Sequence, residues 1–183
     1  CVTISGSLPA GIDSDYYIQL VAAAHAAGVP VLLDTSGASL DAVLTADVAP
    51  TLIKPNLSEI NALLGTSFTP ADVADLEHVL KEDARFADIP WVVVSMGAAG
   101  SVAFYKGCGY RVTTPAIEAA NATGSGDSTI AGMAHAIAAG MGPEDVLRYG
   151  NACGKLNAMD PQTGHLAIDH WDEVFTSIEV TPL

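Results

Sequence analysis

Basic residues are scarce in this chain. Seven lysine and arginine residues stand against 21 aspartate and glutamate residues, which gives a formal net charge of −14 at pH 7. A surface of this sign repels phosphate backbones and anionic headgroups, so neither a nucleic acid nor a membrane is expected as a partner. Any anionic small molecule has to be held by a few local donors.

Cysteines and long apolar runs are scarce as well. The three cysteines, Cys1, Cys108 and Cys153, lie far apart and form neither a CxxC pair nor an even disulfide framework. No basic segment followed by an apolar run opens the chain, and the apolar stretches are too short to span a bilayer. We therefore expect the cysteines to stay reduced and the protein to be cytoplasmic.

Several common catalytic motifs are missing. The sequence contains no GxxxxGK[ST] and no GxGxxG with an acidic residue at the right distance, which argues against Walker-type and Rossmann dinucleotide sites. The five histidines show no HExxH or other paired ligand spacing, so a zinc site is not expected. No serine lies in a GxSxG elbow, which leaves acyl transfer without a nucleophile.

What the chain does contain is a regular alternation of short apolar runs and helical patterns. This alternation is typical of an α/β fold with a largely parallel sheet. No linker, repeat or low-complexity tract divides the chain, so we expect a single domain over residues 1–183. The expected strands are Val2–Ser5, Val31–Asp34, Thr51–Lys54, Trp91–Ser95, Ser101–Tyr105 and Tyr110–Thr113. The expected helices are Asp15–Ala27, Ser39–Leu44, Leu57–Leu64, Ala71–Glu82, Ser128–Ala139, Pro143–Leu156 and Trp171–Phe175.

The most informative segment is the glycine-rich turn Asn121-Ala122-Thr123-Gly124-Ser125-Gly126-Asp127, which precedes an alanine-rich helical stretch. The first turn of a helix presents unpaired backbone N–H groups, and glycines let phosphate oxygens approach them closely. The segment therefore predicts an anion cradle made by Gly124, Ser125 and Gly126, with Asp127 as a base. A purely structural helix cap is the alternative, because glycine-rich turns also cap ordinary helices.

Polar residues follow the expected strands, at the edge where ligands collect in open α/β sheets. Turn formers and helix caps use the same residue types, so each cluster alone is equally consistent with a structural role. Asp34 is left out of the catalytic set for this reason. The clusters are Gly6-Ser7, Asp34-Thr35-Ser36-Gly37, Lys54-Pro55-Asn56 with Glu59, and Ser95-Met96-Gly97 with Gly100.

Asn56 and Glu59 support two interpretations. Their spacing places both side chains near one face of the first turn of a helix. There they could hold water around Mg²⁺, a cation that keeps several waters and takes few protein ligands. They could also form a capping pair, with Asn56 as N-cap and Glu59 reaching back to it, and on spacing alone the cap is the better interpretation.

Taken together, these motifs resemble the ribokinase-like (PfkB) carbohydrate kinases. Asn121–Asp127 resembles the second signature of that family, whose G-A/S-G-D core carries the catalytic aspartate. The other motifs stand in the order of the sugar-phosphate branch, which contains 1-phosphofructokinase and tagatose-6-phosphate kinase, and Leu156-Asn157-Ala158 with Gln162–His165 is more similar to the latter. They are Ser5–Pro9, Asp34–Gly37, Leu52–Asn56 with Glu59, and Val94–Gly97 with Gly100.

The resemblance implies a three-layer α/β fold and ATP-dependent phosphoryl transfer to a hydroxyl of a ketohexose monophosphate. By similarity, Asp127 takes the proton from the hydroxyl, and the amides from Gly124 to Asp127 form the anion hole. Asn56 and Glu59 match the element that organises Mg²⁺ through water. The other residues implied to bind the nucleotide are Ser95, Gly97 and Gly100 along ATP, with Lys54 nearby and Asn151 close to the nucleotide's base side.

The resemblance also bears on substrate and assembly. Tagatose 6-phosphate is the expected substrate and fructose 1-phosphate the alternative. Because Val2–Ser5 already has the pattern of a buried strand, we expect the chain to start in mid-fold, as the C-terminal catalytic and ATP-binding portion of such a kinase without its N-terminal part and lid. The intact protein is expected to be a homodimer. A remnant that binds a nucleotide or a partner protein without catalysis is the competing hypothesis.

Overall fold

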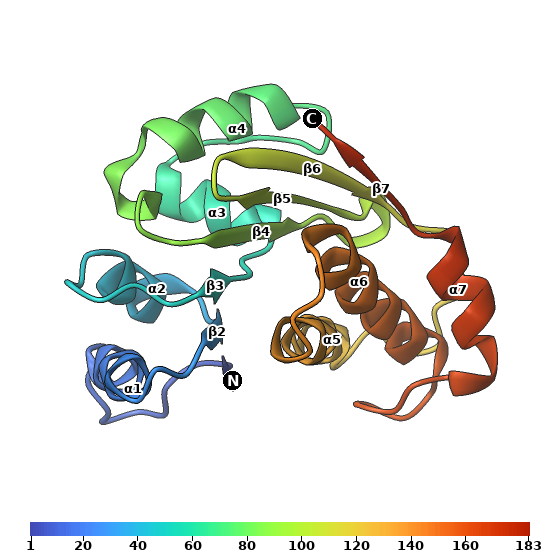
Figure 1. Cartoon of the computed structure of the whole chain (residues 1–183), viewed down its shortest axis with the longest axis horizontal. Coiled ribbons are helices and arrows are strands. Elements are labelled where there is room, and N and C mark those ends of the chain that lie inside the picture. Colours follow the sequence, from blue (N-terminus) through green and yellow to red (C-terminus); the bar gives the residue numbers. More distant parts are fainter. The chain divides into compact units, whose positions relative to one another are not determined.

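The predicted alternation of strands and helices is confirmed by the computed structural model, which describes residues 1–183 (Figure 1). The strands are β1 (Val2–Ser5), β2 (Val31–Asp34), β3 (Leu52–Ile53), β4 (Trp91–Ser95), β5 (Ser101–Tyr105), β6 (Cys108–Thr113) and β7 (Glu179–Pro182). The helices are α1 (Tyr16–Ala26), α2 (Gly37–Leu44), α3 (Leu57–Leu64), α4 (Val73–Glu82), α5 (Ser125–Ala138), α6 (Pro143–Met159) and α7 (Trp171–Ser177), with short 3₁₀ turns at Ala84–Phe86, Gly97–Ala99 and Ile168–His170.

The chain divides into two compact units. The first comprises Cys1–Met96 with Val102–Gly109, and the second comprises Gly97–Ser101 with Tyr110–Leu183. The expectation of a single α/β domain over residues 1–183 stays a prediction. None of the helices combines the length and apolar character needed to cross a bilayer.

The first unit is built around parallel strands. β1 pairs with β2, β2 with β3 and β3 with β4, with Ile4 opposite Leu33 and Ile53 opposite Val92. Because strand order follows chain order and such crossovers are right-handed, the connecting helices lie on one face, and α1 packs on α2 and α2 on α3 (Figure 1). Consecutive residues such as Leu32 and Leu33 are fully buried, so both faces of these strands are covered. This confirms the largely parallel α/β class.

Several boundaries differ from the predictions. β3 is only two residues long, because Pro55 follows closely and cannot donate to a ladder. The hairpin after β5 turns through Lys106 and Gly107 alone, both at positive φ, and β6 therefore starts at Cys108.

The second unit joins the helix pair α5 and α6 to α7 and the antiparallel pair β6–β7. β7 was not predicted, because it is short and mostly exposed and ends in a proline. α5 begins at Ser125, three residues earlier than expected, so Asp127 lies inside its first turn.

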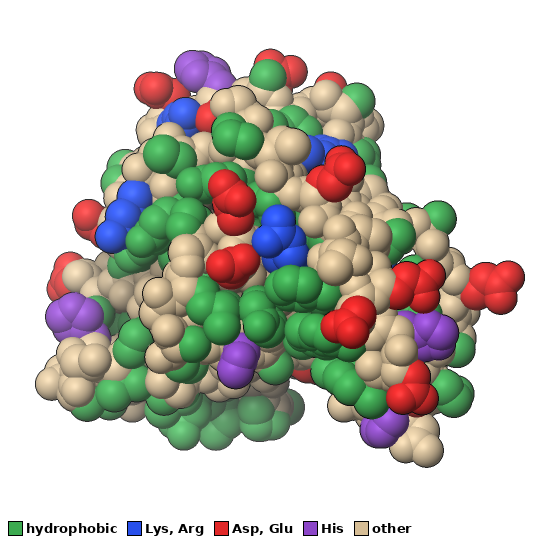
Figure 2. All heavy atoms as spheres, turned by 45° about the vertical axis from the view of Figure 1, so that its right-hand side comes forward, with side chains coloured by type: hydrophobic (Ala, Val, Ile, Leu, Met, Phe, Trp, Pro, Cys, Tyr) green, Lys and Arg blue, Asp and Glu red, His purple; other side chains and the backbone are tan.

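Acidic side chains are dispersed over the face of the molecule in Figure 2 and do not gather in one patch there. On this face, the negative charge counted in the sequence is therefore spread out.

Helices α5 and α6 approach closely where one or the other carries glycine. A Cβ built on Gly132 would lie 2.5 Å from the carbonyl oxygen of Tyr149 and 2.9 Å from the Cys153 sulfur. A backbone carbonyl in α6 cannot move aside without shifting the helix. Gly132 therefore fixes the separation of the two helices.

We expect Gly132→Ala to lower the free energy of unfolding by about 2 kcal/mol, the usual cost of overpacking. Helix propensity alone predicts the opposite sign, a gain of up to about 1 kcal/mol. Urea unfolding measures the difference. Ala131→Gly, at an exposed position of the same helix, gives the effect of helix propensity alone. A stabilised Gly132→Ala variant would contradict the close packing.

Candidate functional site

The carboxyl ends of β2 and β3 carry a buried ion pair. Asp34 is the last residue of β2 and Lys54 follows β3, and the Lys54 Nζ lies 2.9 Å from Asp34 Oδ2. The side chain of Lys54 is only 5% exposed. Lys54, predicted to lie near ATP, therefore directs its charge to a neighbouring strand end within the first unit.

Asn56 and Glu59 form the complete capping box at the start of α3. The Asn56 Oδ1 accepts from the Glu59 N–H at 2.9 Å, and the Asn56 N–H donates to Glu59 Oε2 at 2.8 Å. The capping interpretation is thus confirmed, and only one carboxylate oxygen of Glu59 is used by it. Both residues also line a cavity of about 590 Å³ beside Ser36 and Asp41.

No group of three or more histidine, cysteine, aspartate or glutamate side chains converges on a point that could hold a metal ion. Carboxylate and amide oxygens are nevertheless donors that suit Mg²⁺ held mainly by water and phosphate. Asn56 and Glu59 fit that kind of site, because the capping box leaves one Glu59 carboxylate oxygen free and Asn56 lies exposed at the helix start.

Ser95 ends β4 in the first unit, where its N–H donates to the carbonyl of Pro55 at 3.0 Å. Gly97 and Gly100 belong to the second unit, where Gly97 opens a 3₁₀ turn and Gly100 follows it, with φ of +57° and +82°. A Cβ on Gly100 would collide with the carbonyl oxygen of Val112, so only glycine fits there.

The anion loop, Asn121–Asp127, ends in the first turn of α5. Gly124 adopts a left-handed conformation with φ of +87°, which turns the chain into the helix. The N–H of Ser125 donates to the carbonyl of Ala122 at 3.2 Å. The N–H groups of Gly124, Gly126 and Asp127 have no acceptor within the protein. They are the unpaired donors that a helix start offers to an anion.

Asp127 lies in that first turn with its side chain exposed. Asn151, predicted near the nucleotide base, is only 9% exposed. Its Nδ2 donates to the Leu147 carbonyl at 2.9 Å and to Ser101 Oγ at 3.2 Å. Its amide is therefore engaged within the second unit.

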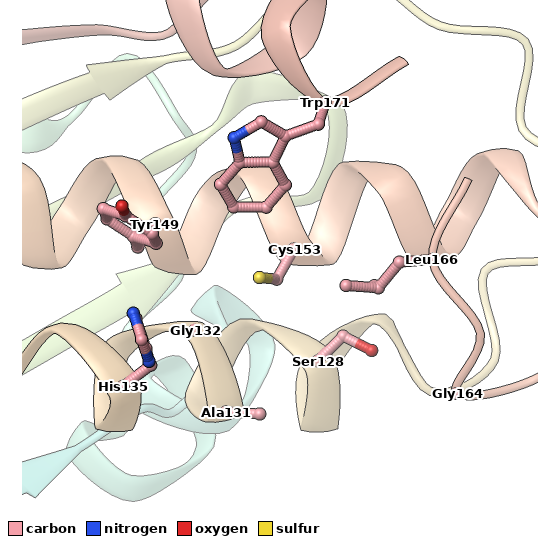
Figure 3. A pocket seen from close by; sticks show the side chains of 9 residues that line it. All are labelled: Ser128, Ala131, Gly132, His135, Tyr149, Cys153, Gly164, Leu166 and Trp171. Atoms are coloured by element: carbon pink, nitrogen blue, oxygen red, sulfur yellow. The ribbon is translucent and has the colours of Figure 1, made fainter. Parts of the chain in front are cut away.

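A cavity of about 340 Å³ lies between α5 and α6 (Figure 3). The side chains of His135, Tyr149, Cys153 and Trp171 line it, and the anion loop does not. Burial raises the pKa of the Cys153 thiol, so the sulfur is less reactive than an exposed cysteine. Sequence reasoning missed this cavity, because its walls come from α5, α6, the loop after α6 and α7, and only the fold brings them together.

Sequence reasoning also missed the part played by Asn157. This residue is fully buried in α6 and hydrogen-bonds to Ser125 of the anion loop. The sequence did hold a signal, since Asn157 is a polar residue among apolar helix residues. A polar side chain that becomes buried needs a specific hydrogen-bond partner.

We expect Asp34→Ala to lower the free energy of unfolding by about 3 kcal/mol, because it leaves the buried Lys54 ammonium uncompensated. Urea unfolding measures the change. Asp47→Ala, at an exposed position, is the matched control and should change stability by less than about 0.5 kcal/mol. The double variant Asp34→Leu with Lys54→Met should recover most of the loss, and an equally unstable double variant would contradict the ion-pair explanation.

Comparison with known proteins places this architecture in a family. The model of the pfkB family of carbohydrate kinases matches residues 1–170. Tagatose-6-phosphate kinases from two strains of Staphylococcus epidermidis are 43% and 42% identical over 177 residues, which is 97% of this chain and 56% of theirs. The structure of Escherichia coli phosphofructokinase-2 in complex with potassium superposes with a TM-score of 0.82 at 28% identity, over 95% of this chain and 55% of that one. The chain thus spans about half the length of the curated relatives it matches. It belongs to the pfkB family of carbohydrate kinases.

Proposed function

We propose that this chain is the catalytic and nucleotide-binding portion of an ATP-dependent kinase acting on a ketohexose monophosphate. The preferred substrate is tagatose 6-phosphate, and the product is tagatose 1,6-bisphosphate. The observation that carries the proposal is the anion loop, which offers three unpaired amides beside the Asp127 carboxylate at one helix start. The relatives named tagatose-6-phosphate kinase support the choice of substrate.

The proposed chemistry needs little from the protein beyond position and charge. Phosphoryl transfer has a charge-rich transition state, which preorganised N–H donors stabilise. The amides of Gly124, Gly126 and Asp127 would receive the oxygens of the transferring group, and Ser125 keeps the loop in shape through its bond to Ala122. The Asp127 carboxylate would orient the sugar hydroxyl and accept its proton late in the transfer.

The first unit would contribute to Mg²⁺–ATP. A Mg²⁺ ion held there would neutralise charge on the phosphates. Asn56 and Glu59 would orient its waters, because one Glu59 carboxylate oxygen is not used by the capping box and Asn56 lies exposed at the helix start. Lys54 would act through its ion pair with Asp34, by keeping the strand end in place.

The other residues proposed to contact the nucleotide are supported to different degrees by their positions in the structure. Ser95, Gly97 and Gly100 lie at strand ends and turns, where backbone can approach a ligand. Asn151 has the least support, because its amide is already paired. A homodimer of the intact protein and a cytoplasmic location also belong to the proposal.

Fructose 1-phosphate is the second candidate substrate. It is the alternative because the motifs of this chain also resemble the branch that contains 1-phosphofructokinase. A coupled ADP-release assay with each sugar phosphate ranks the two by kcat/KM. The assay compares this chain with a form extended at its N-terminus, because the relatives are nearly twice as long. If neither form releases ADP with either sugar phosphate, a non-catalytic binding role is favoured.

We expect Asp127→Asn to lower kcat by about a hundredfold or more, the range for a lost general base, with ATP binding nearly unchanged. The ADP-release assay and calorimetric ATP titration measure the two effects. Asp145→Asn is the matched control, because Asp145 lies in the first turn of α6, away from the anion loop. Near-normal turnover of Asp127→Asn would rule out this residue as the base.

Glu59 allows the cap and the metal role to be separated. Glu59→Gln keeps a side chain that can complete a capping box, so its stability should match that of the unaltered chain. Glu59→Ala should lose about 1 kcal/mol in urea unfolding. Both variants should weaken Mg²⁺-dependent ATP binding by roughly tenfold, as one lost charged contact would. Unchanged binding in Glu59→Gln would leave Glu59 as a cap only.

A further inference from the structure

A second loop of the second unit lies directly against the anion loop. We call it the bracing loop, Asp160–His165, and it follows α6. A Cβ built on Gly124 would lie 3.0 Å from Thr163 Cγ2 and 3.1 Å from the Gly164 nitrogen. The two loops therefore touch at the residue that turns the chain into α5, and the position of one constrains the other.

Asn157 joins both loops from inside. Its side chain is fully buried in α6. Its Oδ1 accepts from the Ser125 hydroxyl at 3.2 Å, and its Nδ2 donates to the His165 carbonyl at 3.0 Å. This arrangement needs one acceptor and one donor on a short side chain, which aspartate and leucine do not provide.

Asn121 makes a second connection from the other end of the anion loop. Its Nδ2 donates to the Pro161 carbonyl at 3.2 Å and to Thr163 Oγ1 at 3.1 Å. Its Oδ1 accepts from the Thr123 N–H at 3.0 Å. Amide side chains therefore tie the bracing loop to the anion loop on both sides of Gly124.

The bracing loop is itself held together by Asp160. One carboxylate oxygen accepts from the Gln162 N–H and the other contacts His165 Nδ1, both at 2.8 Å. The Gln162 backbone N–H and then His165 hold the pKa of Asp160 below its usual value. The carboxylate therefore stays ionised at neutral pH, and the loop has a defined shape against which Asn121 and Asn157 can act.

We propose that Asn157, supported by Asn121, is a positioning residue that sets the direction of the unpaired amides of Gly126 and Asp127. The inference rests on the proposed function, because it assumes that these amides receive a phosphoryl group. Donors that are aimed before the ligand arrives need no reorganisation when charge develops. A small rotation of the Ser125 turn would redirect both amides and weaken their combined effect.

The test follows binding of inorganic phosphate to the ¹⁵N-labelled chain, through the amide resonances of Gly126 and Asp127. In the unaltered chain both resonances should shift saturably. Asn157→Leu loses two hydrogen bonds and should bind phosphate roughly tenfold more weakly, and Asn121→Ala roughly threefold. Asn121 is only partly buried, so its variant remains informative if Asn157→Leu does not fold.

Asn61 provides the matched control in the first unit. It also clamps the chain after its helix, with Nδ2 donating to the Phe68 carbonyl at 2.8 Å and Oδ1 accepting from Thr66 Oγ1 at 2.9 Å. Asn61→Leu should lose stability in urea unfolding, as Asn157→Leu does, while phosphate binding stays unchanged.

The outcomes separate the two proposals. If the unaltered chain responds to phosphate and the Asn157 and Asn121 variants bind it equally well, the positioning role is overturned and the proposed function stands. Equal weakening in Asn61→Leu would also overturn it, because the effect would then follow stability alone. If Gly126 and Asp127 of the unaltered chain do not respond to phosphate, the anion hole and the positioning role both fall.

Discussion

The second unit is organised around backbone donors that have no acceptor in the protein. A helix start always leaves such donors, and most proteins satisfy them with a side-chain cap or with water. At α5 the Gly124 position cannot supply a side-chain cap, and the chain enters the helix in a left-handed turn. Such a turn holds its shape only if its neighbours define it. The bracing loop, the buried amide of Asn157 and the close packing of α5 on α6 all serve that geometry.

The first unit meets a different constraint, the concentration of polar groups at the carboxyl ends of parallel strands. An ammonium as buried as that of Lys54 is tolerated only beside an opposite charge, and Asp34 provides it across two neighbouring strands. Just after Lys54, Asn56 and Glu59 complete the capping box at the start of α3 without any ligand. The edge is thus ordered by contacts within the first unit alone.

Much of this organisation could be read from the sequence, because buried parallel strands and their helices have strong apolar patterns. The strands Val31–Asp34 and Trp91–Ser95 were predicted with the observed bounds. The strand Glu179–Pro182 was not, since a short exposed segment pairs through its backbone and leaves no pattern. The tight turn before α5 was predicted from its glycines, and its role in anion binding stays a prediction. The contact of Asn157 with Ser125 joins residues 32 positions apart and depends on how two helices pack. The assignments of Lys54 and Asn151 came from family resemblance, and pattern alone could not show that both side chains are engaged internally.

The three glycines between α5 and α6 face different obstacles to a larger residue, so related sequences are expected to tolerate substitution at them to different degrees. A Cβ on Gly132 meets the Tyr149 carbonyl, an atom present whatever residue stands there, so no change elsewhere compensates for its loss. A Cβ on Gly150 meets the side chain of Met133, and one on Gly154 meets the hydroxyl of Thr129. The nearest obstacles there are side chains, and backbone oxygens follow only at 3.1 and 3.2 Å, so alanine at 150 or 154 becomes easier to tolerate when the facing side chain is smaller. Homologous chains should therefore keep glycine at 132 and change positions 133 with 150, and 129 with 154, as coupled pairs.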